Sequence, residues 1–196
     1  MTQPLILAST STYKKMLLDR LQLQFTCEPP NIDEKALNSE SPSAMAQRLA
    51  EQKAVAVAKT FPEALVIGAD QVADLNGKIL SKPGNYQRAV EQLSAQSGQE
   101  LKFHSGISVV QITKNGKITK KTKLNTTEVL FRTLNQQQIE QYLKIDQPYD
   151  CAGSFKVEAL GISLFERIDS NDPSSLIGLP LIELCSILSE YGVKTI

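Results

Sequence analysis

The stretch Leu5-Ile6-Leu7-Ala8-Ser9-Thr10-Ser11-Thr12 joins a short apolar run to a cluster of hydroxyl side chains. The apolar run predicts a buried strand, and the hydroxyl cluster is suited to capping the helix that follows. That helix is expected from about Tyr13 to Leu21, because Tyr13, Met16, Leu17 and Leu21 recur at helical spacing. A strand that runs directly into a helix is a building unit of α/β folds.

Further helices are expected at about residues 43–60, 86–97, 135–145 and 180–191. Strands are expected at residues 64–69, 101–113, 117–131 and 162–168, the first of them ending at Asp70-Gln71. Asn76-Gly77 predicts a tight turn that pairs residues 71–75 with residues 78–80. This mixture of βα units and antiparallel pairs predicts an α/β or α+β fold, with a curved mixed sheet and helices outside it.

Composition limits the class of protein. A chain of 196 residues that is 41% hydrophobic can bury one substantial core, so we expect a single domain over residues 1–196. Its 21 basic and 21 acidic side chains give zero net charge, which argues against a dedicated nucleic-acid binder. No apolar run is long enough for a membrane span. Three scattered cysteines have neither disulfide nor zinc spacing and fit a reducing cytosol, so a cytoplasmic protein is expected.

The strand-to-helix junction is the first candidate for chemistry. A helix N-terminus presents free N–H groups and a partial positive charge, which suits a phosphate. The hydroxyls of Ser9 and Ser11 add donors, and Lys14 and Lys15 add charge one turn further on. The alternative is an ordinary helix cap with two solvated lysines.

Two more lysines are candidates for binding phosphate. Lys53 lies within the apolar stripe of the second helix, so its side chain either snorkels at the edge of the stripe or points into a cleft. Lys82 precedes Pro83, which fixes the local backbone, and the alternative is a solvated loop lysine.

Carboxylates complete the set. Asp70 follows an apolar strand, where open α/β sheets place ligand sites, and could bind a divalent metal or act as a general base. Glu34 in a turn-rich loop could be a second metal ligand. The alternatives are that Asp70 is a turn aspartate and that Glu34 lies in a solvated loop. His104, the only histidine, is interpreted as structural.

At these positions the sequence resembles the Maf family. Residues 7–15, 67–72, 80–83, 151–158 and 178–182 match its motifs in the family's order over nearly the whole chain. The segment Cys151-Ala152-Gly153-Ser154-Phe155-Lys156-Val157-Glu158 is similar to the YceF-like branch, which is associated with 7-methyl-GTP pyrophosphatase activity. One departure is Lys14-Lys15 in place of the family's usual arginines, which keeps the charge but loses the planar fork that grips phosphate.

The resemblance implies two lobes around a deep cleft and a role for each candidate. Asp70 would accept the proton of the attacking water, and Glu34 and Asp70 would bind Mg²⁺ or Mn²⁺. The phosphate would meet Ser9, Lys14, Lys53 and Lys82. Specificity would depend on the positions of Tyr13, Gln71 and Glu158. The family is compatible with a homodimer, for which the sequence offers no separate sign.

The function expected from these residues is hydrolysis of a small nucleotide, 7-methyl-GTP, to the monophosphate and pyrophosphate, which removes a modified nucleotide. An aromatic face at Tyr13 would attract the positive ring of 7-methylguanine, and Glu158 could accept hydrogen bonds from the guanine edge. The alternatives are that Tyr13 is a core aromatic and that Glu158 is a solvated charge in a loop. Hydrolysis of dTTP, UTP or other non-standard nucleotides is a second hypothesis, and a weakly hydrolytic nucleotide-binding regulator of cell division is a third.

Overall fold

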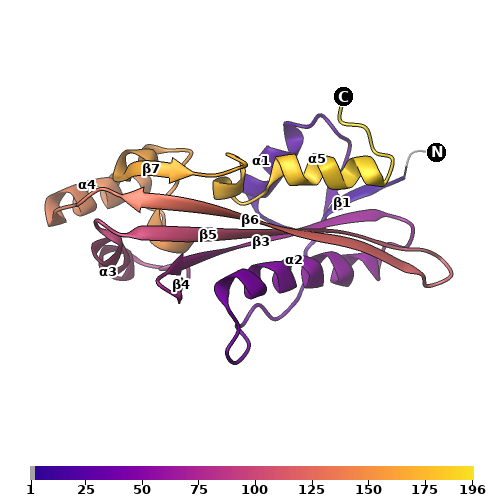
Figure 1. Ribbon diagram of the computed structural model, residues 1–196, viewed down its shortest axis with the longest axis horizontal. Helices are drawn as coiled ribbons and strands as arrows, with labels where there is room; N and C mark the ends of the chain where they lie inside the picture. Colours follow the sequence, from indigo (N-terminus) through magenta and orange to yellow (C-terminus); the bar gives the residue numbers. More distant parts are fainter. Residues whose placement is uncertain (1–2) are drawn as a thin grey trace.

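The computed structural model describes residues 3–196, and in this range seven strands form one mixed sheet (Figure 1). The sheet has the order β2-β1-β3-β5-β6-β7, with β4 paired to β3. The strands are β1 (Leu5–Leu7), β2 (Thr26–Cys27), β3 (Leu65–Leu75), β4 (Lys78–Leu80), β5 (Glu100–Ile112), β6 (Ile118–Phe131) and β7 (Phe165–Asp169). Strand β1 is parallel to β2 and β3, whereas every other pair is antiparallel. The predicted curved mixed sheet with outer helices is therefore confirmed.

Five α-helices cover the described part of the sheet: α1 (Thr12–Asp19), α2 (Pro42–Ala58), α3 (Tyr86–Gln96), α4 (Gln136–Asp146) and α5 (Leu181–Glu190). Side chains that alternate along β3 and β5 point to opposite faces. Ile67 and Val109 pack in a core with α1 and α5, whereas Val66 and Val110 pack against α2. Figure 1 accordingly shows α2 on one face of the sheet and α5 on the other.

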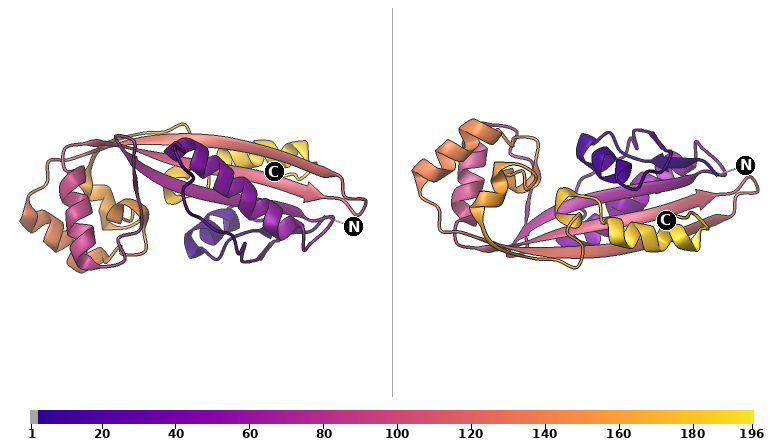
Figure 2. Two further views of the ribbon diagram at one scale, coloured as in Figure 1. Left: turned by 90° about the horizontal axis from the view of Figure 1, so that it is seen from below. Right: turned by 90° about the horizontal axis from the view of Figure 1, so that it is seen from above.

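The molecule has two lobes, as the family resemblance implied. Figure 2 shows α3 and α4 gathered at one end, and α1, α2 and α5 at the other, with long strands running between them. The smaller lobe has its own core, in which Phe103, Phe131, Phe155 and Phe165 meet edge to face. Strands β3, β5 and β6 thus belong to both lobes and hold them together.

The expectation that a strand ends at Asp70 is wrong. Strand β3 continues without a break from Leu65 to Leu75 and pairs with β5 along that length, with Asp70 opposite Gly106. Two polar residues are tolerated in mid-strand because both Asp70 and Gln71 line a cleft between the lobes. The predicted strand at 64–69 and the first strand of the predicted hairpin are one element.

Helix α2 lies unusually close to the sheet. A Cβ atom on Gly68 would overlap the carbonyl of Ala50, and one on Gly106 would overlap the carbonyl of Ala46. Both sites therefore need a residue without a side chain, because α2 occupies the space. This approach places the residues of α2 within reach of those on β3.

The expected strand at 162–168 is partly wrong. Residues Leu160–Leu164 form a 3₁₀ helix, and β7 begins only at Phe165. The reason is local: Gly161 lies against the backbone of Lys156, and its N–H donates to Asp146 at 3.1 Å. These contacts fold the chain back before it can enter the sheet. The short strand β2 was not predicted, since two residues carry too weak a pattern.

Candidate active site

A cleft of about 710 Å³ opens between the two lobes. Nine side chains that the sequence predicted for the site line it together: Ser9, Tyr13, Lys14, Glu34, Lys53, Asp70, Gln71, Lys82 and Glu158. They come from the start of α1, from α2 and β3, and from loops near residues 34, 82 and 158. Segments far apart in sequence thus meet at one surface, as a binding site requires.

Lys53 points into this cleft and does not snorkel along α2. Its Nζ lies 2.6 Å from Oδ1 of Asp70 and 2.8 Å from Oε1 of Glu34. Lys53 and Asp70 are 8% and 9% exposed, whereas Glu34 is exposed. Burial opposes the charge on Lys53, but the attraction and hydrogen bonds of Asp70 and Glu34 outweigh it and raise the pKa of Lys53. One ammonium therefore holds two carboxylates together.

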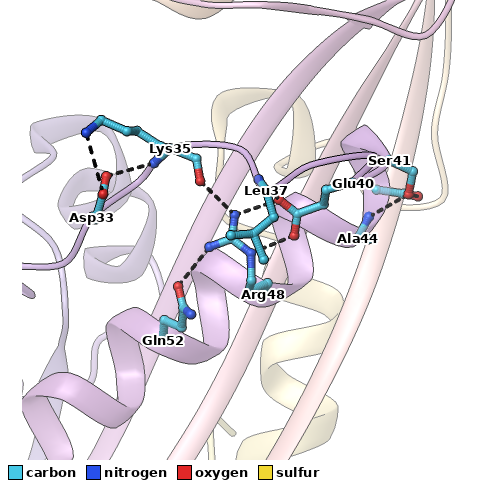
Figure 3. A network of polar contacts seen from close by, with 9 residues as sticks. Asp33, Lys35, Leu37, Glu40, Ser41, Ala44, Arg48 and Gln52 are labelled. Atoms are coloured by element: carbon cyan, nitrogen blue, oxygen red, sulfur yellow. Dashed lines mark hydrogen bonds and ion pairs between the residues drawn. The ribbon is translucent and has the colours of Figure 1, made fainter.

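The loop that carries Glu34 is held by Arg48 on α2 (Figure 3). The Arg48 guanidinium makes two hydrogen bonds of 2.6 Å to the carboxylate of Glu40 and a third, of 3.1 Å, to the carbonyl of Lys35. It also donates to Gln52 at 2.9 Å. Arg48 was not predicted as a site residue. Its position five residues before Lys53 on the same helix was the available signal.

The junction before α1 has the expected shape of a helix cap. The hydroxyl of Ser11 accepts from the N–H of Lys14 at 3.4 Å, and that of Ser9 accepts from the N–H of Ser11 at 3.1 Å. Both hydroxyls still have a proton that they can donate to a ligand. Lys14 lines the cleft, but Lys15 turns away and pairs with Asp19 at 3.1 Å. Of the two lysines, therefore, only Lys14 lies in the cleft where a phosphate could reach it.

Lys14 stands among several charges. Burial lowers the pKa of its ammonium, and the nearby charges of Lys53 and Lys82 lower it further, although Asp70 opposes them. Lys82 is exposed at the rim. Three lysines around one cleft repel each other, so an anionic ligand would relieve this repulsion.

The residues expected to read the base also line this cleft. Burial and the charges of Asp150 and Glu158 contribute to raising the pKa of Tyr13 to about 12. Tyr13 is half-buried and lines the cleft, so it is not a core residue of α1. The amide nitrogen of Gln71 donates to the carbonyls of Ser175 and Leu176 at 2.9 and 3.0 Å. This leaves the oxygen of Gln71 as the group available to a ligand.

Within residues 3–196 no group of three or more His, Cys, Asp or Glu side chains has a geometry that could hold a metal ion. His104 bonds instead to Thr126 at 3.0 Å and Asp74 at 3.3 Å, in agreement with a structural role. The carboxylates of Asp70 and Glu34 both contact the ammonium of Lys53, and carboxylate oxygens are the hard donors that Mg²⁺ and Mn²⁺ prefer. Beside that ammonium they would supply two ligands to a metal whose remaining ligands would be water and substrate oxygens.

The fold resembles that of two solved structures. The structure is similar to that of a HAM1 protein from Coxiella burnetii, with a TM-score of 0.51 at 15% identity, covering 96% of this chain and 100% of the other. It is also similar to the Ham1 protein of Staphylococcus aureus, with a TM-score of 0.50 at 14% identity and the same coverage. At such identities the likeness concerns the fold alone.

The sequence identifies the family. The model of the Maf-like protein family matches residues 4–191, and the chain belongs to the Maf family. It is 52% identical to a protein of Xanthomonas axonopodis pv. citri, with 97% of both chains covered. It is 48% identical to one of Polaromonas sp., with 98% of this chain and 86% of the other covered. A protein of Pseudoalteromonas translucida is 47% identical, with 100% and 96% covered. All three relatives carry the name 7-methyl-GTP pyrophosphatase.

No helix of the described residues has the length and hydrophobicity needed to cross a membrane.

Proposed function

We propose that this protein hydrolyses 7-methyl-GTP to 7-methyl-GMP and pyrophosphate, and so removes a modified nucleotide from the cell. The observation that carries the proposal is the buried Lys53–Asp70 pair, which lies in one cleft with Glu34, Lys14 and Lys82. The nucleotide is inferred from the names of the relatives, whose sequences match nearly the whole chain at 47–52% identity.

In this proposal Asp70 orients a water molecule and accepts its proton. The water oxygen forms a bond to the α-phosphorus, the bond from that phosphorus to the bridging oxygen breaks, and pyrophosphate leaves. The ammonium groups of Lys14, Lys53 and Lys82 bind the phosphate oxygens, where negative charge develops. The Lys53 hydrogen bond keeps one oxygen of Asp70 fixed, so that the second carboxylate oxygen is directed to the water.

A divalent cation is part of the proposal, with Asp70 and Glu34 as its protein ligands. When bound, Mg²⁺ or Mn²⁺ would neutralise triphosphate charge and make the α-phosphorus more electrophilic. The pairing of both carboxylates with Lys53 supports this assignment, because it holds oxygen donors from two separate segments close together in the cleft before any ligand arrives.

Recognition of the base is assigned to the wall that holds Tyr13 and Glu158. The face of Tyr13 attracts the cationic 7-methylguanine ring. The carboxylate of Glu158 accepts from the guanine N1–H and amine, which a pyrimidine does not offer in that arrangement. Gln71 contributes an acceptor oxygen, since its amide nitrogen already binds the backbone at residues 175 and 176.

Pyrophosphate release over a panel of 7-methyl-GTP, GTP, dTTP and UTP tests the proposal, with Mg²⁺ or Mn²⁺ and with a chelator. We expect 7-methyl-GTP to have the highest kcat/KM and the chelator to abolish release. A higher kcat/KM on dTTP or UTP would indicate the pyrimidine activity instead. Tight nucleotide binding without release would indicate a regulator. Glu158→Gln is expected to lower the preference for 7-methyl-GTP over UTP.

A further inference from the structure

Helix α3 lies outside the cleft, yet one of its side chains contacts two of the loops that form the cleft walls. The amide nitrogen of Gln92 donates to the carbonyl of Ser81 at 2.9 Å. The amide oxygen of the same side chain accepts from the hydroxyl of Ser154 at 2.5 Å. A single half-buried glutamine therefore joins two segments that are separated by more than seventy residues of sequence.

Each of these loops carries a group that faces the cleft. Ser81 immediately precedes Lys82, which is assigned to the phosphates, and Ser154 lies four residues before Glu158, which is assigned to the base. The backbone supplies a second link, because the N–H of Gly84 donates to the carbonyl of Tyr149 at 2.9 Å. The phosphate-binding and base-binding sides of the cleft thus share one support on α3.

The chemistry of the link fits an amide and no other side chain of that length. Gln92 must donate to a carbonyl and accept from a hydroxyl, and only an amide supplies both groups. A glutamate would turn an acceptor toward the Ser81 carbonyl. One helical turn further on, the amide nitrogen of Gln96, a fully buried residue, donates to the carbonyl of Gly153 at 2.9 Å.

The Ser154 loop depends on such support. Gly153 and Ser154 both adopt positive φ, at 77° and 63°. For serine this conformation costs about 1 kcal/mol or more, so it persists only where the surroundings hold it. Ser154 is fully buried, and its hydroxyl bond to Gln92 is one of the contacts that hold it.

We infer that Gln92 is a positioning residue that sets the placement of Lys82 relative to Glu158, and so controls which nucleotide is hydrolysed. The inference rests on the proposed function, since it takes the two loops as the phosphate-binding and base-binding sides. Gln92 itself touches no ligand: it acts through Ser81 and Ser154. Small displacements of a bound substrate have large effects on rate, which makes such a support measurable.

The test compares Gln92→Ala with Gln87→Ala, a matched control on the exposed side of α3 whose amide donates to Glu91 on the same helix. We measure kcat and KM for 7-methyl-GTP and UTP. For Gln92→Ala we expect the ratio of kcat/KM values between these nucleotides to fall at least tenfold, with unchanged circular dichroism. Gln87→Ala is expected to keep the ratio of the unmodified protein.

A second variant keeps the inference testable even if Gln92→Ala fails to fold. Ser154→Ala removes the same link from the other side, so its effect on the ratio should not add to that of Gln92→Ala in the double variant. An unchanged ratio in both single variants, or equal losses on both nucleotides, would overturn the inference and leave the proposed function standing. An unmodified protein that releases no pyrophosphate from any nucleotide would overturn both.

Discussion

Lys53 and Asp70 form a buried ion pair of 2.6 Å that joins helix α2 to strand β3 at the cleft between the lobes. Because α2 lies close against Gly68 and Gly106, the long lysine side chain reaches the carboxylate directly. The pair therefore links the packing of the larger lobe to the chemistry of the site.

Replacing Lys53 by methionine is expected to impair both stability and turnover. Removing one partner of a fully buried pair costs about 3–5 kcal/mol, and the open cleft lowers this, so we expect a loss of about 1–3 kcal/mol in the free energy of unfolding. Turnover should fall at least about a hundredfold, since charge stabilisation at the phosphates is lost. Lys59→Met, an exposed site at the end of the same helix, should leave both urea unfolding and turnover unchanged. Equal behaviour of the two variants would contradict the assigned role.

Gly68→Ala is expected to push α2 away from the sheet. The new methyl group would overlap the Ala50 carbonyl, and overpacking of this kind costs about 1–3 kcal/mol. Because Lys53 moves with α2, KM for the nucleotide should also rise. Gly116→Ala in the β5–β6 turn is the control, since its positive φ costs about 1 kcal/mol far from the site. A normal KM for Gly68→Ala at reduced thermal stability would show that the close approach is structural alone.

The Glu40–Arg48 pair predicts a dependence on pH (Figure 3). The hydrogen bonds from Arg48 lower the pKa of the Glu40 carboxyl, against the effect of its burial. A depressed pKa in the folded state means that this stabilisation is present above the pKa of the unfolded chain, about 4.3, and is lost as pH falls through the folded value. Glu40→Gln should therefore be less stable than the unmodified protein at pH 7, with the difference shrinking below about pH 4.

Urea unfolding of both proteins between pH 3 and pH 7 measures this difference. The control is Glu91→Gln on α3, whose exposed carboxylate accepts from the neutral amide of Gln87. Its stability relative to the unmodified protein should vary much less with pH. If the stability difference between Glu40→Gln and the unmodified protein stayed constant or grew as the pH fell, the role of the ion pair would be refuted.

Tyr13 is expected to discriminate 7-methyl-GTP from GTP through its ring. Tyr13→Leu removes the aromatic face and should lower the ratio of kcat/KM between these two nucleotides by about fivefold, because an exposed cation–π contact contributes about 1 kcal/mol. Tyr13→Phe keeps the face and should retain the ratio. The tyrosine hydroxyl stays neutral below its raised pKa of about 12, so titration of Tyr13 itself should not alter the ratio between pH 6 and pH 9. If Tyr13→Phe lowered this ratio as much as Tyr13→Leu does, the effect would belong to the hydroxyl and not to the ring.

Most of the helices and long strands followed from the sequence, because hydrophobic periodicity and turn residues are local signals. Local signals misplaced the end of β3, where Asp70 and Gln71 read as a strand terminus. Their polarity is explained by the cleft they face, which depends on the second lobe. The 3₁₀ helix at Leu160–Leu164 was missed for the same reason, since Asp146 on α4 holds Gly161.

The candidate site was predicted chiefly through motifs that match the family. Spacing alone left Lys53 undecided between snorkelling and facing a cleft, and the fold decides it through the contact with Asp70. Residues that act through others escaped prediction. Gln92 shows no local signature of function and Arg48 only its spacing from Lys53, because their partners at Glu40, Ser81 and Ser154 come together only in the folded chain.

The most direct test of the account is pyrophosphate release from 7-methyl-GTP by Asp70→Asn, carried out in ¹⁸O-labelled water alongside the unmodified protein. Asp74→Asn is the control, since Asp74 lies on the same strand and bonds to His104 away from the cleft. With the unmodified protein, we expect the ¹⁸O label from water to appear in the monophosphate product. We expect Asp70→Asn to stay folded with turnover reduced at least about a thousandfold, as the loss of a general base predicts. Turnover by folded Asp70→Asn within a few-fold of the unmodified protein, or label in pyrophosphate, would contradict it.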